Sequence, residues 1–506
     1  MASRKFWSAK TIGAVPRFGR LRQSQPQQKR GSSILHSKIL SLNEAAQWRA
    51  DDDRRAWVLC HGCFDLFHVG HLKHLQAAKA LGDYLVVSIT SDAFVNKGPG
   101  RPVFSAEKRA EMLAALECVD YVVIVDGPSA LPAIEAIQPD IYCKGSDYKG
   151  EDITGKFDQE KAAVESHGGK VAFTDCETHS SSSLINEHMP VFDEETTAFL
   201  KKAKADGVAE QIQGYLGKIK TLKVLVVGEM ITDKYIYVSA LGKSAKENII
   251  ATEYKSQEAF DGGIAAVVKH IDHLCRTALM LSDRRLTKTR YVEPPYTRKL
   301  FEVYQSEPDI YDSGFFRDEL TGCLNWADVI IVCDYGHGMI TPEVVAALVS
   351  QPKFLAVNVQ TNAGNLGYNL LTKYPRADFL CVDAMEARLA AQDRHSDIGH
   401  LAGFALPELI DCPAIVVTHG SAGCYVYDQF SNTTTHVPAF RQTVVDTMGA
   451  GDAFFAIASL FAYCGASPEI IGLVGNVAGA MKVGVVGHRE PTDPVKFQRY
   501  IQTLLK

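Results

Sequence analysis

The sequence contains no uninterrupted apolar run of roughly eighteen residues, the length that a membrane-spanning helix needs, so such a helix is excluded. It also lacks the regular cysteine spacing of disulfide-stabilised secreted domains. Its 12 cysteines are scattered, which indicates reduced, intracellular thiols. The net charge of −6 gives no general reason for binding nucleic acid or a membrane, and we find no internal repeat. A chain of 506 residues is too long for one core, so we expect two or three domains.

Acidic residues are absent from residues 1–43, which hold nine lysines or arginines among serines and glutamines. This composition cannot bury a core, so we expect a disordered basic extension. A basic, acid-free start also resembles an organelle transit peptide. We favour a solvated extension on a cytoplasmic protein, with organelle targeting as the alternative.

Between residues 44 and 190, short apolar runs alternate with amphipathic stretches. Five of the runs are expected to be buried strands: Trp57–Cys60, Tyr84–Thr90, Tyr121–Val125, Ile141–Lys144 and Lys170–Thr174. Helices are expected between them, including His71–Leu81 and Ala106–Ala115. Such alternation predicts a parallel sheet covered by helices on both faces, so 44–190 are expected to form one α/β domain.

Residues 191–220 are polar, charged and helix-prone, and we expect them to form a helical linker. A second α/β alternation then predicts another doubly wound, Rossmann-like domain over residues 221–506. Its expected strands are Lys223–Gly228, Val329–Cys333, Phe354–Val359, Phe379–Val382 and Ala414–Thr418, and its last helices are Gly451–Cys464 and Glu469–Val485. The predicted fold class is therefore α/β, with two doubly wound domains.

The first chemical motif is a glycine-containing loop, Cys60–Asp65, that leads into His68-Val-Gly-His71 at the start of an expected helix. Gly62 lets the backbone approach phosphates, and the helix start adds free N–H groups and a favourable dipole. His68 and His71 are three residues apart, so they share one side of the first turn. There they can donate hydrogen bonds to an α-phosphate while negative charge develops in an in-line displacement. A lone histidine at a helix start is more often a cap, but the two in register predict a nucleotidyl-transfer site.

Because of this loop and the two histidines, residues 57–188 resemble the HxGH cytidylyltransferase-like family. They resemble in particular the adenylyltransferase half of bifunctional ADP-heptose synthases. The resemblance implies an HxGH nucleotidyltransferase fold with His68 and His71 as catalytic residues. It implies that Lys97 and Arg101 neutralise a triphosphate or a sugar phosphate. The other nucleotide-binding residues that it implies are Gly62, Phe64, Asp65, Lys144, Gly145, Asp147, Ser181, Ser182 and Ser183.

The second chemical motif is Gly449-Ala-Gly-Asp452, which opens an apolar helix. Its glycines keep side chains away, so that backbone N–H groups can form an anion pocket for a phosphoryl group. Asp452 can accept the proton of an attacking hydroxyl. A single GxGD is also consistent with a helix cap, but the preceding Asp446 and the turn Thr418–Gly423 favour phosphoryl transfer.

These residues resemble the ribokinase-like (PfkB) sugar kinases, and residues 223–506 resemble in particular the kinase half of ADP-heptose synthases. The resemblance implies a ribokinase-like fold in which Asp452 is catalytic and Glu386 helps to organise Mg²⁺ through water. The substrate-binding residues that it implies are Asp233, Gly262, Gly263 and Asp334. The nucleotide-binding residues that it implies are Thr418, Gly420, Gly423, Gly449, Ala450, Gly451 and Asn476.

The second half departs from that family at several positions. After Gly263 the chain offers no asparagine for a sugar, His337 replaces an expected lysine, and Asp383 replaces an expected asparagine. The segment Met280–Tyr291 is short, and the transferase half comes first instead of the kinase half. A sugar hydroxyl that is buried without a hydrogen-bond partner costs roughly 1–3 kcal/mol of binding free energy. These departures predict a changed substrate or a weakened kinase.

Together the motifs predict a bifunctional enzyme of nucleotide-sugar synthesis. It would phosphorylate a sugar phosphate, such as a heptose 7-phosphate, and join a sugar 1-phosphate to a nucleotide with release of pyrophosphate. The expected cofactors are Mg²⁺ and ATP, with CTP as the alternative for the first half. The expected partners are these small molecules and a second copy of the chain; nucleic acid and membranes are not expected. The resemblance to ribokinase-like proteins implies pairing through a small β lid, which Tyr235–Phe260 could supply.

Two alternatives stay open. One is a nucleotidyltransferase for a small phosphorylated alcohol or sugar, whose kinase-like half is non-catalytic or has changed its substrate. The other is a binding or scaffold protein that senses metabolites without turnover.

Overall fold

The structure, a computed structural model, describes residues 38–52, 54–95, 101–145, 156–175, 192–282, 285–293, 298–306, 313–440, 446–484 and 491–506. Five predicted site residues lie outside the described residues: Lys97, Asp147, Ser181, Ser182 and Ser183. Among the helices that are described, none is long and apolar enough to cross a lipid bilayer.

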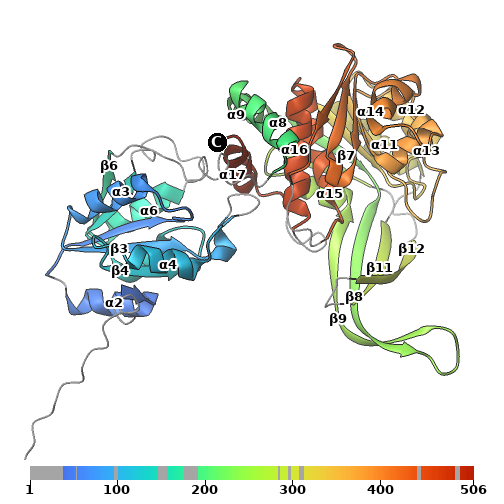
Figure 1. Cartoon of the computed structure of the whole chain (residues 1–506). Coiled ribbons are helices and arrows are strands. Elements are labelled where there is room, and N and C mark those ends of the chain that lie inside the picture. Colours follow the sequence, from blue (N-terminus) through green and yellow to red (C-terminus); the bar gives the residue numbers. More distant parts are fainter. Residues whose placement is uncertain are drawn as a thin grey trace, which may run out of the picture.

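The first sheet has six parallel strands in the order β1-β4-β3-β2-β5-β6 (Figure 1). The strands are β1 Ile39–Leu40, β2 Trp57–Gly62, β3 Tyr84–Thr90, β4 Tyr121–Val125, β5 Ile141–Gly145 and β6 Lys170–Thr174. The order reverses beside β2, and ligands of open α/β sheets bind at the carboxyl end of such a strand. The glycine-containing loop begins at that end.

Helices cover both faces of this sheet because the β2 side chains alternate between two apolar cores. Val58 and Cys60 pack with α3 and α4, whereas Trp57 and Leu59 pack with α5. The helices are α2 Leu42–Asp51, α3 Val69–Lys79, η1 Asp92–Phe94, α4 Ala106–Ala114, α5 Leu131–Ile137 and α6 Lys156–Ser166.

Residues 38–43, placed in the basic extension by the sequence, belong to this unit. Leu40 is buried, and β1 pairs with β4. The ammonium of Lys38 donates to the carbonyl oxygens of Leu116 (3.1 Å) and Val119 (2.7 Å). One apolar side chain and a lysine that satisfies two carbonyl groups are enough to fix this short segment.

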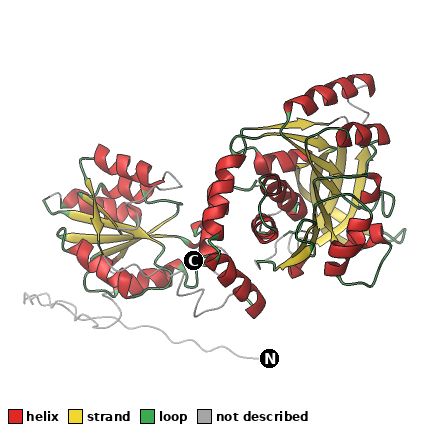
Figure 2. Ribbon diagram, turned by 90° about the horizontal axis from the view of Figure 1, so that it is seen from above, coloured by secondary structure: helices red, strands yellow, loops and turns green. Residues whose placement is uncertain are grey.

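The second sheet has eight strands in the order β10-β7-β13-β14-β15-β16-β17-β18, parallel as far as β16 and antiparallel beyond it. They are β7 Lys223–Gly228, β10 Thr277–Leu281, β13 Val329–Asp334, β14 Phe354–Val359, β15 Phe379–Asp383, β16 Ala414–Thr418, β17 Cys424–Asp428 and β18 Thr433–Val437. Helices again flank the sheet on both sides (Figure 2). The predicted α/β class with parallel sheets is confirmed.

Two helical layers enclose this sheet. One layer comprises α8 Glu194–Ala205, α9 Val208–Ile219, α10 Ile264–Ile271, α15 Ala450–Tyr463, α16 Pro468–Lys482 and α17 Pro494–Leu504. The other comprises α11 Ser313–Trp326, α12 Pro342–Val349, α13 Ala384–Ala391, α14 Ile398–His400 and the short turns η5 Leu401–Ala405 and η6 Leu406–Glu408. Two further turns, η4 Leu371–Lys373 and η7 Gly420–Ala422, lie in loops.

Helices α8 and α9, expected as a linker, bury their apolar faces in the second core. Leu200, Ile212, Leu216 and Ile219 all belong to the same cluster as the α15 and α16 side chains.

Four strands form a separate small sheet in the order β12-β11-β8-β9. The strands are β8 Met230–Lys243, β9 Ile250–Gly263, β11 Arg285–Glu293 and β12 Arg298–Ser306. The β8–β9 hairpin contains the predicted hairpin segment and extends beyond its neighbours (Figure 1). We call these four strands the small sheet.

Candidate active sites

The loop after β2 brings the two predicted histidines into contact. His68 is the N-cap of α3, and its Nδ1 accepts hydrogen bonds from the backbone N–H groups of Gly70 (3.1 Å) and His71 (3.4 Å). The His68 and His71 rings stack with centroids 3.8 Å apart. Because Nδ1 is the acceptor, a neutral His68 carries its proton on Nε2, which makes Nε2 a donor. The histidine thus caps the helix and has the tautomer that donation to a phosphate requires.

Gly62 and Phe64 support this histidine pair. The backbone of Phe64 is left-handed (φ 49°), and its ring lies 5.1 Å from the His71 ring, centroid to centroid. A Cβ placed on Gly62 would lie 3.0 Å from Cε2 of Phe64. The glycine therefore leaves room for the ring that supports His71.

A buried arginine that the sequence analysis missed holds the same loop. Arg109 on α4 has no exposed surface, and its guanidinium donates to the carbonyl oxygens of Cys63 (2.6 Å), Thr90 (2.9 Å) and Phe104 (2.9 Å). It also pairs with Asp92 at 2.6 Å. Its only sequence signal is a charged residue on the apolar side of an expected helix.

Asp65 and Arg101 lie on one side of this loop. Asp65 is buried and accepts from the backbone N–H groups of Val103 (2.7 Å) and Phe104 (3.1 Å). Burial lowers the pKa of Arg101, while the nearby Asp65 acts in the opposite direction. Asp65 thus fixes the segment that carries Arg101.

Lys144 lies on the other face of the first sheet. Its ammonium is 3.5 Å from Oε2 of Glu160 on α6, and Gly145 ends the same strand. Burial, and to a smaller extent Lys144, lower the pKa of His61 to about 3, so His61 is neutral at physiological pH. Lys144 therefore sits in an ion pair on the α5 side of the sheet, whereas the histidine pair begins α3.

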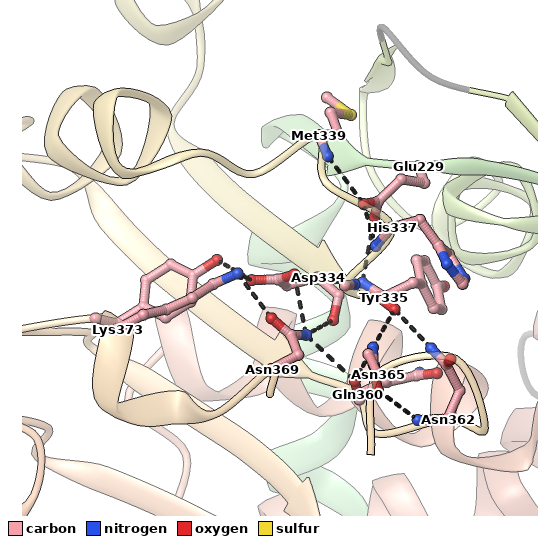
Figure 3. A network of polar contacts seen from close by, with 12 residues as sticks. Glu229, Asp334, Tyr335, His337, Met339, Gln360, Asn362, Asn365, Asn369 and Lys373 are labelled. Carbon is pink, nitrogen blue, oxygen red and sulfur yellow. Dashed lines mark hydrogen bonds and ion pairs between the residues drawn. The ribbon is translucent and has the colours of Figure 1, made fainter. Parts of the chain in front are cut away.

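In the second half, Glu229 organises the loop that follows β13. Its fully buried carboxylate accepts from the backbone N–H groups of Tyr335 (3.2 Å), His337 (3.0 Å) and Met339 (3.3 Å), as Figure 3 shows. Burial and the neighbouring Asp334 raise the pKa of Glu229. The sequence analysis did not single out this residue, because its partners lie more than 100 positions away.

Asp334, a predicted substrate ligand, is engaged within the fold. It is fully buried, accepts from Tyr374 (2.8 Å) and Asn369 (3.2 Å), and forms an ion pair with Lys373. Asn362 and Asn365 both donate to the carbonyl oxygen of Tyr335, at 2.7 and 2.9 Å. Figure 3 shows how these groups join the loops after β13 and β14.

Asp452 lies in the first turn of α15, behind the predicted anion pocket. Its Oδ1 accepts from the hydroxyl of Tyr335 (3.2 Å) and from Nε2 of Gln360 (2.8 Å). Gly449 caps the helix with a left-handed backbone (φ 75°), and a Cβ on Gly451 would meet no described atom within 4 Å. The space in front of Gly451 is open, as an approaching phosphoryl group requires.

The small sheet holds the predicted sugar ligand Asp233 in an ion pair with Arg290, and both side chains are buried. A Cβ on Gly262 would lie 2.2 Å from Oδ2 of Asp233, and one on Gly263 would lie 2.4 Å from the carbonyl oxygen of Glu229. The double glycine therefore permits the close approach of β9 to these two acidic residues.

The predicted nucleotide-binding turns lie at the far end of the second sheet. Gly420 and Gly423 both have left-handed backbones, and a Cβ on Gly423 would lie 2.2 Å from the carbonyl oxygen of Val437. Asn476 on α16 donates to the same carbonyl oxygen (3.1 Å), and Thr418 ends β16. These residues are brought together around one turn, with Asn476 bracing it.

Glu386 and Asp383 fit a magnesium ion held mainly by water. Each accepts from the backbone N–H of the other, at 2.7 and 2.8 Å. Burial, and to a smaller extent the neighbouring Asp383, raise the pKa of Glu386 to about 8. Among the described residues, no group of three or more potential ligands could hold a metal directly. Mg²⁺ usually keeps several waters and binds through one or two carboxylates and substrate phosphates.

Two regions of the chain match known protein families. Residues 59–188 match the family described as Cytidylyltransferase-like, and residues 356–494 match the pfkB family of carbohydrate kinases. The chain therefore joins a nucleotidyltransferase-like region to a carbohydrate-kinase region. These regions imply the use of a nucleoside triphosphate and a small-molecule substrate.

Particular relatives share only part of the chain. The "Bifunctional protein HldE" of Syntrophotalea carbinolica is 46% identical over 134 residues, which is 26% of this chain and 26% of that one. The protein of the same name from Methylobacillus flagellatus is 38% identical over 180 residues, 34% and 35% of the two chains. The chain thus spans about a quarter to a third of the length of these curated relatives. A ribokinase structure from Thermotoga maritima covers 56% of this chain and 99% of its own, with 15% identity and a TM-score of 0.43.

Proposed function

We propose that the protein is a bifunctional enzyme of nucleotide-sugar synthesis, a sugar-phosphate kinase joined to a sugar 1-phosphate nucleotidyltransferase. The observation that supports the proposal most is the stacked His68–His71 pair at the carboxyl end of β2. The second support is Asp452 behind the open glycine turn of α15.

In the first reaction, a sugar 1-phosphate oxygen attacks the α-phosphate of ATP or CTP, and pyrophosphate leaves. His68, with its proton on Nε2, and His71 stabilise the charge that builds on the α-phosphate. The start of α3 adds a favourable dipole for the same anion. No covalent enzyme intermediate is needed.

In the second reaction, Asp452 accepts the proton of the sugar hydroxyl that attacks the γ-phosphate of ATP. The backbone around Gly449–Gly451 receives the transferred phosphoryl group. A magnesium ion, when bound near Glu386 and Asp383, would neutralise charge on the nucleotide phosphates. Thr418, Gly420 and Gly423 line the nucleotide.

Two observations favour a second candidate, in which the kinase half phosphorylates a different acceptor or is not catalytic. Asp233 is already paired with Arg290, and Ala265 and Ala266 follow the double glycine without an amide. The protein would then be a nucleotidyltransferase for a small phosphorylated alcohol or sugar.

We further propose a homo-oligomer that forms through the β8–β9 hairpin, and a cytoplasmic location. The hairpin exposes the large apolar side chains Leu241, Ile250 and Tyr254, at 67%, 63% and 59% of their surface. All of the described cysteines are free thiols, which supports a reducing compartment.

The test of the transferase uses His68→Asn against His68→Ala, with pyrophosphate release measured for four nucleoside triphosphates and several sugar 1-phosphates. Asparagine keeps the helix cap and removes the ring, so we expect a rate loss of about 100- to 1,000-fold at unchanged stability. Alanine should lose the same rate and about 1 kcal/mol of stability as well. If His68→Asn released pyrophosphate as fast as wild type, His68 would be only a helix cap and not a catalytic residue.

The test of the kinase is ATP consumption with candidate sugar phosphates in Asp452→Asn. Loss of the general base should lower the rate by about 100- to 10,000-fold. Equal consumption by mutant and wild type would remove the kinase claim and leave the second candidate.

A further inference from the structure

Strand β11 carries two cations on its buried face. The alternation of the strand places Leu286, Lys288, Arg290 and Val292 on the face that the structure buries. Two charged side chains on an apolar face require an explanation, because burying a charge costs several kcal/mol unless a partner compensates it.

The partners of Arg290 explain one of the two charges. Its guanidinium pairs with Asp233 on β8, and its Nε lies 3.3 Å from Oε2 of Glu302 on β12. Arg290 therefore has two carboxylate partners in direct contact.

The environment of Lys288 differs. Only 8% of its surface is exposed, and it makes no ion pair or hydrogen bond with any described residue. Its Nζ lies 5.1 Å from the centre of the Tyr304 ring, a contact that stabilises a cation only modestly. Burial accordingly lowers the pKa of Lys288, although Asp233, Glu302 and Asp452 act against the shift.

Contacts on both sides place Lys288 at the proposed phosphoryl-transfer site. In the parallel pairing of β11 with β8, Lys288 lies opposite Asp233. The Tyr304 ring beneath the ammonium lies 6.0 Å from the ring of His337, between centroids. His337 belongs to the loop whose Tyr335 donates to Asp452. Lys288 therefore lies between Asp233 on β8 and the Tyr335–Met339 loop, which it approaches through the Tyr304 ring.

We propose that Lys288 binds a phosphate group that the phosphoryl acceptor already carries, at the wall of the site formed by the small sheet. The inference rests on the proposed kinase function, to which it adds a binding site for the phosphate group of the acceptor. A phosphate monoester supplies the directly contacting anion that the Lys288 ammonium lacks among the described residues, and lysine serves as a point charge for phosphate. The transferred γ-phosphoryl group of ATP is the other possible source of the same chemistry. The position of Lys288 beside Asp233 favours the acceptor.

The kinetic test compares Lys288→Met with the matched control Lys255→Met. Lys255 lies on β9 of the same sheet, is exposed and pairs with Glu253. Wild type should phosphorylate five- to seven-carbon sugar monophosphates and not the unphosphorylated sugars. Lys288→Met should raise the KM for the sugar monophosphate on the order of 10- to 100-fold, with the KM for ATP unchanged. Lys255→Met should match wild type.

Two kinetic results would overturn the inference. One is a fall in kcat in Lys288→Met with both KM values unchanged, which would assign the lysine to the γ-phosphoryl group. The other is a wild-type enzyme that prefers unphosphorylated sugars.

A binding test does not depend on turnover. The probe is inorganic phosphate, titrated with a non-hydrolysable ATP analogue and magnesium present to fill the nucleotide site. Phosphate should bind wild type, Lys288→Arg and Lys255→Met alike, and about tenfold or more weakly to Lys288→Met. Equal binding to all four proteins would overturn the inference. If no acceptor is phosphorylated but this pattern holds, the proposed kinase function fails and the anion site stands.

Thermal unfolding without phosphate separates this role from a structural one. A cation kept for a ligand destabilises the empty site, so Lys288→Met should unfold at the same or a higher temperature than wild type. A marked decrease in the unfolding temperature would make Lys288 a structural residue held by Tyr304.

Discussion

At the scale of single residues, two histidines of the first half show how the neighbours of a ring decide where its proton lies. His68 caps a helix through Nδ1, so its proton is on Nε2. His61 lies on the other face of the sheet, with Nδ1 2.9 Å from the hydroxyl of Ser88 and Nε2 3.3 Å from that of Thr90. Hydroxyl partners accept or donate without adding charge, so nothing there favours an imidazolium.

Because His61 is neutral in the folded protein, we expect the free energy of unfolding to decrease in mild acid. Its pKa in the folded protein is about 3, against 6.5 in the absence of these surroundings. Between these pH values the unfolded chain binds more protons, so the free energy of unfolding falls as pH falls. The loss from this residue is at most about 1.4 kcal/mol per pH unit.

The measurement is the denaturant midpoint of the first half between pH 7 and 4. His61→Asn should flatten the pH dependence, whereas the control His167→Asn, at an exposed position, should keep it. A pH dependence in His61→Asn as steep as in wild type would contradict the assignment.

At the scale of elements, the segment after β14 contacts Asp452, the proposed general base of the second site. Gln360 donates to Asp452, while its own carbonyl oxygen accepts from Asn365 (3.3 Å) and Asn369 (3.2 Å). Burial and the nearby Asp452 raise the pKa of Tyr335, so its hydroxyl stays protonated and remains the second donor to that carboxylate. Two elements thus orient one oxygen of Asp452.

Replacing Gln360 should therefore lower turnover more than substrate binding. We expect Gln360→Met to reduce the kcat of phosphoryl transfer about 10- to 100-fold, with little change in the KM for ATP, because a misplaced base loses its geometry. The matched control is Asn362→Ser, which removes a bond to the Tyr335 carbonyl in the same loop and spares Asp452. A kcat that falls equally in the two variants would indicate general loosening of the loop.

The strands show which elements a sequence can predict. The ranges expected for β3, β4, β6, β7, β14 and β16 match the observed ones at both ends. Apart from the edge strand β6, each is a nearly continuous apolar run, which is typical of a strand that is covered on both faces of a sheet. Strand β11 was not expected, because its buried face carries Lys288 and Arg290 and so hides the apolar alternation.

The site was predictable to the extent that its chemistry is local. His68 and His71 share a single helical turn, and the sequence alone pairs them. Arg109 and Gln360 act on groups 46 and 92 positions away, and no local pattern reveals such contacts. The ion pair that occupies Asp233 likewise forms only when two strands align.

At the scale of the whole molecule, α8 and α9 belong physically to the second half. Their apolar faces lie in its core, and Oε1 of Glu195 on α8 lies 2.7 Å from Nδ1 of His436. The other ring nitrogen of His436 lies 2.8 Å from the carbonyl oxygen of Ala422, within the predicted nucleotide turn. The segment between the two predicted catalytic regions therefore contacts one of them.

A fragment of residues 192–506 should accordingly fold better than one of residues 221–506. Each buried leucine or isoleucine contributes about 1.5–3 kcal/mol, and the shorter fragment loses Leu200, Ile212, Leu216 and Ile219 and exposes the surface that they cover. We expect the shorter fragment to aggregate or to unfold at a clearly lower temperature. Calorimetry and light scattering on the two fragments would check this, and equal behaviour would show that the helices are dispensable.

Asp446 has a consequence for how the two substrates of the second half affect one another. Its carboxylate accepts from Tyr235 on β8 (3.2 Å), from Lys299 on β12 (3.1 Å) and from the backbone of Met448 (3.2 Å), just before the glycine turn of α15. Asp446 therefore links those two strands directly to the segment that precedes α15. If a ligand at the small sheet changes the affinity of the α15 turn for its own ligand through this link, thermodynamic reciprocity requires the converse. The ligand at the α15 turn then changes the affinity of the small sheet by the same factor.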